Sequence, residues 1–375
     1  MDAVRLGEIY QNKKVLVTGH TGFKGSWLSQ WLLMLGAKVY GYALAPPTQP
    51  AMFEQLGLSG DMADRRADIR HFDQLLGYLK DVKPDIIFHM AAQPLVRDSY
   101  DRPLETVEVN TLGTANLLEA IRQAGEPVVA IMVTSDKCYR NREWILGYRE
   151  DDPMGGHDVY SASKGTAELL IDSWRMAFFP PASLARHGVG IASVRAGNVI
   201  GGGDWAKDRI VPDTIRALRL GKAVDLRNPT ATRPWQHVLE PLSGYLELGG
   251  ILLDENTSAD RKETLCTGLN FGPAVSSNRS TKVLVERIIG AWGEGTWEDK
   301  SDPEAAHEAQ LLQLSIEKAY HLLGWQPIWD LGTAVERTVE WYRYAMADSA
   351  RARQATMDQI AAYEEDRVAE GSARP

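Results

Sequence analysis

Short, continuous apolar runs alternate with helical patterns through the first half of this 375-residue chain. The apolar runs cover residues 14–18, 38–42, 85–89, 128–134 and 190–195. Helical patterns lie between them, the clearest at Ser26–Leu35, Pro103–Ala124 and Val159–Phe179. Strands that are apolar on both faces are typical of a parallel sheet covered by helices on both sides. The alternation therefore predicts an α/β protein with a doubly wound parallel sheet.

The pattern changes after Gly197, where three glycines at 201–203 interrupt the chain and later helices are separated by irregular stretches. We expect a sheet domain over residues 1–197, to which some later segments return. Residues 198–345 are expected to form mainly a smaller, mixed α/β lobe that binds substrate. Residues 346–375 should be a surface helix that frays into a disordered tail from Gly371 onward.

Composition excludes several classes of partner. The chain has 41 Lys and Arg against 50 Asp and Glu, a net charge of −9, which argues against nucleic acid as a main partner. It contains no apolar stretch of about 20 residues that could cross a membrane, and the polar N-terminus does not resemble a signal peptide. Two cysteines cannot form a disulfide framework, so the expected setting is the cytoplasm.

Gly19, Gly22 and Gly25 form a G-x-x-G-x-x-G turn between the first strand and the first helix. The first glycine permits a sharp turn, the second lets a pyrophosphate approach the backbone, and the third lets the helix pack close to the strand. The helix N-terminus then presents N–H groups to the phosphates. A plain strand–helix turn is the alternative, but the context favours a Rossmann-type dinucleotide site.

The choice of dinucleotide depends on the tip of the second strand. Residues 39–44 carry neither an acid for a ribose hydroxyl nor an arginine pair for a 2′-phosphate, and the missing arginines favour NAD over NADP. Asp68 and Ile69 follow the expected third strand and are predicted to meet the adenine. For Asp68, a solvated or helix-capping carboxylate is the alternative.

Tyr160 and Lys164 stand four residues apart, on one face of a predicted helix. A nearby ammonium favours the phenolate and lowers the pKa of the tyrosine, which could then accept a proton from an alcohol. Such a spacing also occurs by chance on helix surfaces. Ser135, at the end of an apolar strand, strengthens the functional interpretation, because its hydroxyl could hold a substrate oxygen beside Tyr160.

These residues, with Ala91-Ala92-Gln93 and Asn110, resemble the extended short-chain dehydrogenases/reductases over roughly residues 12–345. The segment Thr-Ser-Asp-Lys-Cys-Tyr at 134–139 resembles that of sugar-nucleotide 4,6-dehydratases. Most of those enzymes have Asp-Glu after the hydroxyl residue, whereas Asp136-Lys137 resembles the CDP-glucose 4,6-dehydratases. Residues 19–27, 195–205 and 233–238 look like the same family.

The resemblance implies that bound NAD moves a hydride from C4 to C6 of CDP-glucose, giving CDP-4-keto-6-deoxyglucose and water. Ser135, Tyr160 and Lys164 would act at C4, Asp136 as the acid at C6 and Lys137 as the base at C5. Lys137 would need burial or a neighbouring cation to stay neutral. A surface ion pair is the alternative for Asp136 and Lys137.

Ligand contacts are implied in the same way. The NAD-binding residues would be Gly19, Thr21, Gly22, Phe23, Lys24, Gly25, Asp68, Ile69, Ala91, Ala92, Gln93, Asn110, Tyr160 and Lys164. The diphosphate of the substrate would meet Asn198 and Arg233, with Arg209 as a second candidate, although each arginine could instead form a structural salt bridge. No metal is expected. The family further implies a homodimer through residues 103–124 and 159–179, with a tetramer as the alternative, and deoxysugar synthesis for the lipopolysaccharide O-antigen.

Other interpretations remain open. A nucleotide-sugar 4-epimerase or a dehydratase for another nucleotide would share most of these motifs, but an epimerase needs no acid at Asp136. A non-catalytic NAD-binding regulatory or scaffold protein is the alternative from a different class. Among the aromatic residues and thiols, Trp27, Trp31 and Trp174 are expected in the core or at a dimer contact, Trp205 and Trp235 around the sugar, and Cys138 as a buried, inert thiol.

Overall fold

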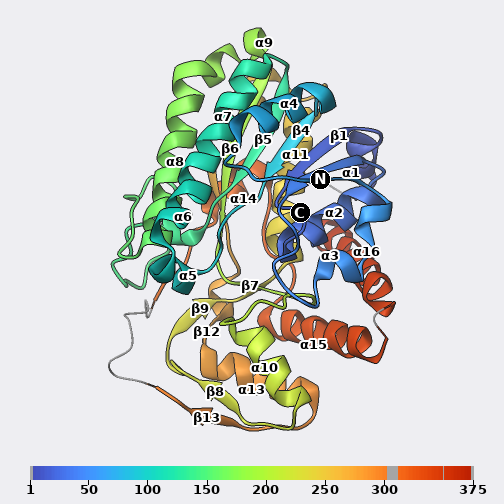
Figure 1. Ribbon diagram of the computed structural model, residues 1–375, viewed down its shortest axis with the longest axis vertical. Helices are drawn as coiled ribbons and strands as arrows, with labels where there is room; N and C mark the ends of the chain where they lie inside the picture. Colours follow the sequence, from blue (N-terminus) through green and yellow to red (C-terminus); the bar gives the residue numbers. More distant parts are fainter. Residues whose placement is uncertain (1–2, 302–310, 349, 373–375) are drawn as a thin grey trace.

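The computed structural model describes residues 3–301, 311–348 and 350–372 and contains the predicted parallel sheet (Figure 1). Seven strands lie in the order β3–β2–β1–β4–β5–β6–β11, and every neighbouring pair is parallel. Their bounds are β1 Lys14–Thr18, β2 Lys38–Ala43, β3 Ala63–Arg66, β4 Ile86–His89, β5 Val128–Val133, β6 Val189–Ala196 and β11 Gly268–Phe271. The strand order reverses between β1 and β4, and ligands of such sheets bind beyond the strand ends at this point.

Successive residues of the central strands enter two different cores, one on each face of the sheet. Val15 and Val17 of β1 pack into one core, and Leu16 packs into the other. The first core is covered by α1 (Ala3–Tyr10), α2 (Phe23–Met34) and α11 (Leu239–Leu253). The second is covered by α4 (Phe72–Val82), α7 (Gly113–Ala124) and α8 (Val159–Phe178). Burial on both faces explains why these strands are continuously apolar.

The helix predicted over Pro103–Ala124 is present but irregular. A π-helical turn at Glu108–Leu112 joins α6 (Pro103–Val107) to α7. Such turns are rare and frequently occur at functional sites. Asn110, a predicted cofactor residue, lies in this turn.

A smaller mixed lobe follows Gly197 (Figure 1). It contains three two-stranded sheets, which pair β7 (Val199–Ile200) with β10 (Gln236–His237), β9 (Thr232–Pro234) with β12 (Asn278–Ser280), and β8 (Val224–Leu226) with β13 (Trp297–Asp299). Its main helices are α10 (Ile210–Arg219), α13 (Thr281–Trp292) and α15 (Leu331–Ala347). Because β11 and α11 return to the large sheet, residues 198–345 do not form a separate body.

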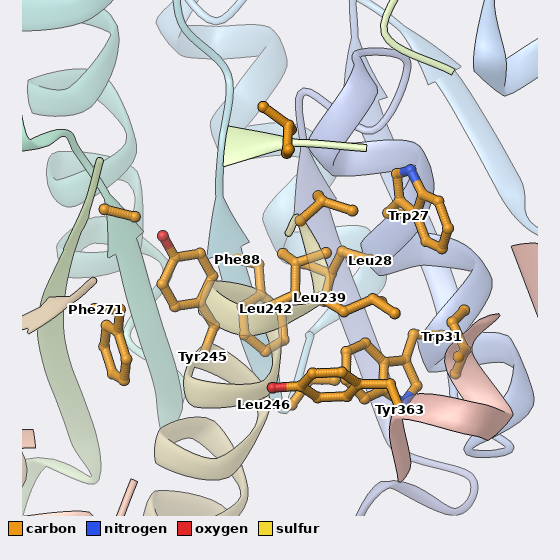
Figure 2. Close-up of a cluster of buried hydrophobic side chains, with 14 of the residues drawn as sticks. Trp27, Leu28, Trp31, Phe88, Leu239, Leu242, Tyr245, Leu246, Phe271 and Tyr363 are labelled. Atoms are coloured by element: carbon orange, nitrogen blue, oxygen red, sulfur yellow. The ribbon is translucent and has the colours of Figure 1, made fainter. Parts of the chain in front are cut away.

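The last helix corrects the expectation of a surface helix. α16 (Arg351–Ser372) buries one face along its length, with Ala352, Thr356, Ile360 and Tyr363 each at most 1% exposed. The Tyr363 ring meets the Trp31 ring of α2 edge to face at 5.9 Å (Figure 2). The expectation was wrong because small and polar residues dominate α16, so its apolar face is narrow. The helix includes Gly371 and Ser372, and the rest of the predicted tail lies outside the described residues.

Five shorter helices complete the described secondary structure apart from single 3₁₀ turns. They are α3 (Met52–Gln55), α5 (Val96–Asp101), α9 (Leu184–His187), α12 (Ala259–Leu265) and α14 (Glu317–Leu323). None of the helices in the described stretches has both the length and the apolar character needed to span a bilayer.

Candidate active site

The glycine turn lies at the carboxyl end of β1, and the space available for a side chain differs among its three glycines. Gly19 has a φ of +76°, and a Cβ there would lie 2.7 Å from the backbone nitrogen of Ala91. A Cβ on Gly25 would lie 2.2 Å from the carbonyl oxygen of Gly19. Gly22 is different, because its nearest neighbour would be that oxygen at 3.5 Å, an ordinary contact. The fold therefore requires the first and third glycines, while the second leaves the backbone open to a ligand.

The N-terminus of α2 is available for an anion. Its first turn has Gly22 at the N-cap and no side-chain cap, so no side-chain oxygen there accepts from the first N–H groups. Thr21 turns away and donates its hydroxyl to the carbonyl of Leu44 at 3.1 Å. Phe23 packs beside Gly201 of the smaller lobe, where a Cβ on that glycine would lie 3.1 Å from its ring.

Asp68 and Ile69 follow β3, in the loop that leads to α4. Arg70 holds the Asp68 carboxylate through Nη2 at 2.7 Å, and this hydrogen bond lowers the pKa of Asp68. Ile69 is buried against Gly113, where a Cβ would lie 2.6 Å from the Ile69 side chain. The structure thus places both residues beyond the strand ends, with Asp68 already paired.

The loop after β4 is hydrogen-bonded to the π-helical turn. The backbone nitrogen of Ala91 donates to the Thr18 hydroxyl at 3.2 Å, and Ala92 follows before Gln93. Asn110 accepts from the backbone nitrogen of Gln93 at 2.8 Å and donates to its carbonyl at 3.1 Å. The same amide donates to the Ser163 hydroxyl at 3.0 Å, which connects this loop to α8.

Ser135, Asp136 and Lys137 lie directly after β5, beyond its carboxyl end. The Ser135 hydroxyl donates to Asp136 Oδ1 at 3.0 Å and accepts from the backbone nitrogen of Lys137 at 3.2 Å. Lys137 Nζ lies 3.4 Å from the same carboxylate oxygen, and its side chain is 28% exposed. Asp136 is buried, and its Oδ2 has no hydrogen-bond partner among the described residues. The neighbour of Lys137 is therefore an anion rather than a cation, and the Lys137 side chain is only partly buried.

Tyr160 and Lys164 lie on the first turns of α8, and both are buried. Burial raises the pKa of Tyr160 to about 12, although a hydrogen bond with Ser135 and the charge of Arg209 oppose the rise. The predicted lowering of this pKa by the lysine is therefore wrong for the protein alone, because burial outweighs the favourable charges. Burial also lowers the pKa of Lys164 to about 8, opposed by the Glu168 carboxylate.

Cationic side chains gather around Asp136. Burial lowers the pKa of Lys24 to about 8, helped by the charges of Lys164 and Arg209 and opposed by Asp136. Arg209, just before α10, also forms an ion pair with Asp204 at 2.8 Å. Lys24, Lys164 and Arg209 therefore lie on one side of the site, although Asp204 pairs with Arg209. Such a group of cations suits a ligand that carries several negative charges.

The other predicted substrate residues lie at the border of the smaller lobe. Asn198 sits between β6 and β7, and its buried Oδ1 has no hydrogen-bond partner among the described residues. Arg233 lies on β9 and donates to the Thr232 carbonyl at 3.0 Å. The next residue is Pro234. A Cβ on Gly197 would lie 3.0 Å from the Pro234 ring and 3.3 Å from Asp136 Oδ2, so β9 lies close to the Asp136 side chain.

Tyr245 of α11 is a residue that the sequence argument missed. It is fully buried beside Phe271 (Figure 2), and Lys24 Nζ lies 5.7 Å from its ring centre. Its hydroxyl has no hydrogen-bond partner among the described residues. An apolar helix gives no sequence signal for such a residue, because only the packing of α11 under the sheet brings it to Lys24.

The tryptophans and Cys138 contact other groups of the protein. Trp27 and Trp31 are buried in the first core, whereas Trp174 is half-buried on α8. Trp205 donates to Gln55 at 2.7 Å, and Trp235 donates to the Arg279 carbonyl at 2.9 Å. Cys138 is buried, and burial raises the pKa of its thiol, as expected for an inert cysteine.

Comparisons with known proteins identify the family. The family model described as GDP-mannose 4,6 dehydratase matches residues 16–338. The CDP-glucose 4,6-dehydratase of Salmonella typhimurium is 49% identical over 337 residues, covering 89% of this chain and 91% of that protein.

Solved structures show the same fold. That of dTDP-glucose 4,6-dehydratase from Bacillus anthracis with NAD covers 88% of this chain and 96% of its own, with a TM-score of 0.70 and 18% identity. That of UDP-glucuronic acid 4-epimerase from Bacillus cereus with NAD covers 88% and 99%, with a TM-score of 0.72 and 22% identity. The motifs, the fold and the family match together place this chain in the GDP-mannose 4,6 dehydratase family of extended short-chain dehydrogenases/reductases.

Proposed function

We propose that this protein is an NAD-dependent CDP-glucose 4,6-dehydratase that converts CDP-D-glucose to CDP-4-keto-6-deoxy-D-glucose and water. The observation that carries the proposal is the buried Asp136 carboxylate, which lies between Ser135 and Lys137 with one oxygen unpartnered among the described residues. An oxidoreductase that only moves hydride at C4 needs no such acid. The relative from Salmonella typhimurium supports the choice of nucleotide.

The residues present fit NAD. The open backbone at Gly22, the N-terminus of α2 without a side-chain cap, and the nearby Lys24 suit a pyrophosphate. The contacts would come from Gly19, Thr21, Gly22, Phe23, Lys24, Gly25, Asp68, Ile69, Ala91, Ala92, Gln93, Asn110, Tyr160 and Lys164. Bound NAD supplies the redox chemistry, an internal hydride transfer from C4 to C6 without net consumption of cofactor.

At C4, Ser135 holds the substrate oxygen and Tyr160 takes the proton of the 4-hydroxyl. The pKa of about 12 for buried Tyr160 is too high for this step at neutral pH, so neighbouring positive charge must stabilise the phenolate. Lys164 and Arg209 carry such charge on this side of the pocket.

Elimination needs an acid at C6 and a base at C5 in the same pocket. Asp136 is the proposed acid at C6 and Lys137 the proposed base at C5, and their side chains lie 3.4 Å apart. In these roles Lys137 would take the C5 proton, and Asp136 would give a proton to the departing 6-hydroxyl, which leaves as water.

Asn198, Arg209 and Arg233 are the proposed contacts of the CDP diphosphate. The position of Pro234, directly after Arg233, beside Gly197 supports this border as the nucleotide side of the site. The cytoplasm is the proposed location, consistent with the free thiols of Cys138 and Cys266. Supply of deoxysugar for O-antigen stays a prediction.

A substrate panel tests the activity. Purified protein with NAD should convert CDP-glucose to a product lighter by one water, found by mass analysis, with little conversion of the UDP, GDP and dTDP sugars. Asp136→Asn should lower dehydration by about 10²–10⁴-fold, as expected for loss of a general acid. A 4-epimerase would keep its activity in this variant. Turnover of none of these sugars would refute the proposal.

We further propose that the protein is a homodimer joined by one apolar flank. α6, α7 and α8 lie side by side (Figure 1) and expose several large apolar side chains. The side chains are Leu104, Val107, Leu112, Leu169, Met176 and Phe178. An apolar surface of this kind is typical of a subunit interface, and a second copy of the chain is the proposed occupant.

A further inference from the structure

A buried ion pair lies beneath residues 135–138, here called the catalytic segment, and is not part of it. Glu168 of α8 and Arg195 of β6 are 4% and 5% exposed, and Arg195 Nη2 lies 2.8 Å from Glu168 Oε2. Desolvation offsets much of the attraction in such a pair, so stability alone is a weak reason for it. What the pair does provide is a set of directed hydrogen bonds in a buried region.

Those hydrogen bonds reach both ends of the catalytic segment. Thr134, directly before Ser135, donates its hydroxyl to Glu168 Oε1. Tyr139, directly after Cys138, accepts from Arg195 Nη1 at 2.6 Å. Residues 135–138 therefore form a short bridge whose two anchor residues bind the two partners of one ion pair.

The far side of the pair is anchored as well. Arg195 Nη1 also donates to the Glu150 carbonyl at 2.9 Å, and the Tyr139 hydroxyl donates to Asn270 Oδ1 of β11 at 2.7 Å. Asn270 in turn donates to the Tyr148 carbonyl at 2.8 Å. The network thus joins β6, β11, the residue that follows β5, α8 and the loop after the catalytic segment.

The helix side connects the pair to the other half of the catalytic set. Glu168 lies one turn after Lys164, so both project from the same side of α8. Between them, a Cβ on Gly165 would lie 3.1 Å from the Cys138 carbonyl. The segment and the helix are therefore in close contact at this point, and a shift of either would change the spacing between Asp136 and Tyr160.

We propose that Glu168 and Arg195 are positioning residues, which hold residues 135–138 in register with Tyr160 and Lys164 by binding Thr134 and Tyr139. This inference rests on the proposed dehydratase function for its activity readout. Neither residue touches substrate or cofactor in this role.

Two hydroxyls on the same carboxylate give a matched test. Thr134→Val removes the hydrogen bond to Glu168 Oε1 and keeps the shape of the side chain. Ser193→Ala removes the 2.7 Å hydrogen bond to Glu168 Oε2 from β6, outside the catalytic segment. Both should lower the denaturation midpoint slightly. Only Thr134→Val should lower kcat for CDP-glucose, by about tenfold or more with KM changed less than about twofold, because misplacement of a catalytic group slows chemistry.

Tyr139→Phe tests the other anchor and should lower kcat in the same way. Equal kcat losses in Thr134→Val and Ser193→Ala, or full activity in Tyr139→Phe, would overturn the inference. Amide hydrogen exchange over residues 134–140 separates it from the proposed function. If the wild type does not turn over CDP-glucose, faster exchange in Thr134→Val than in Ser193→Ala still supports positioning, and equal exchange overturns it.

Discussion

At the scale of single residues, Gly22 shows how packing can separate structural from functional glycines. Its φ of −80° and ψ of 173° are open to any residue, and a Cβ would fit against the protein itself. Gly25 has no such freedom, because a Cβ there would overlap the Gly19 carbonyl. The protein fold itself therefore does not require a glycine at position 22, and the proposed pyrophosphate contact gives a reason for one.

Gly22→Ala should therefore fold normally and bind NAD more weakly. A methyl group forced into a close contact costs about 1–3 kcal/mol, which corresponds to a rise in Kd of about 5- to 150-fold. Calorimetric titration with NAD measures the effect, and thermal unfolding without cofactor is the control. Gly25→Ala should instead lower Tm in the absence of NAD. Unchanged NAD affinity in Gly22→Ala would show that the pyrophosphate does not approach this backbone.

Short-range patterns and the family resemblance were enough to propose Ser135, Tyr160 and Lys164 as catalytic residues, but not to predict their pKa values. Tyr160 and Lys164 are one helical turn apart and Ser135 follows a strand, a spacing that gains weight only with the family motifs. The pKa of Tyr160 depends on how deeply the fold buries it, which no local pattern contains. Tyr245 and the Glu168–Arg195 pair were missed for the same reason, because they become neighbours of the site only through packing.

At the scale of elements, Glu240 joins three segments that are distant in sequence. Its carboxylate accepts from the backbone nitrogens of Ile328 at 3.0 Å and Trp329 at 2.6 Å, just before α15. The Tyr363 hydroxyl of α16 donates to it at 2.8 Å. Burial nevertheless raises the pKa of Glu240 to about 7 from its ordinary 4.5. One titratable group therefore lies where α11, α15 and α16 meet.

This pKa predicts a pH-dependent contribution to stability. A carboxyl whose pKa is raised by folding favours the folded state at low pH, and that contribution falls as pH rises from about 4.5 to about 7. Glu240→Gln cannot titrate. The unfolding free energy of the wild type minus that of Glu240→Gln should fall by about 3 kcal/mol across this window.

Urea unfolding of both proteins at several pH values measures the difference. Glu336→Gln, an exposed change on α15, is the control for the loss of one carboxylate. A difference that rises with pH would mean that the three donors keep Glu240 ionised.

The strand and helix patterns predicted the main elements well where hydrophobic periodicity was strong. β1, β2, β4, β5 and β6 lie within a residue or two of the predicted runs. β11 was assigned to the smaller lobe because parallel pairing with β6 is a long-range contact. α16 looked like a surface helix because its buried face is made largely of small and polar side chains.

At the scale of the whole molecule, the apolar flank of α6 to α8 predicts the state of assembly. Wild-type protein should have twice the 41.6 kDa mass of one chain by light scattering. Leu169→Arg places a charge on this flank, where the leucine is 60% exposed, and should give monomers. Leu220→Arg, at a similarly exposed leucine beyond α10, is the matched control and should remain dimeric. A wild type of single-chain mass would contradict the proposed dimer.

The contact between α16 and α2 also bears on how the protein is made. Domains tend to fold as they leave the ribosome, from the N-terminus onward. Here Trp31, on the helix that follows the glycine turn, is covered by Tyr363 of α16. The first core therefore remains open on this side until α16 has been synthesised. A nascent chain stalled before α16 would expose this surface, and messages truncated before the α16 codons should yield products that chaperones retain.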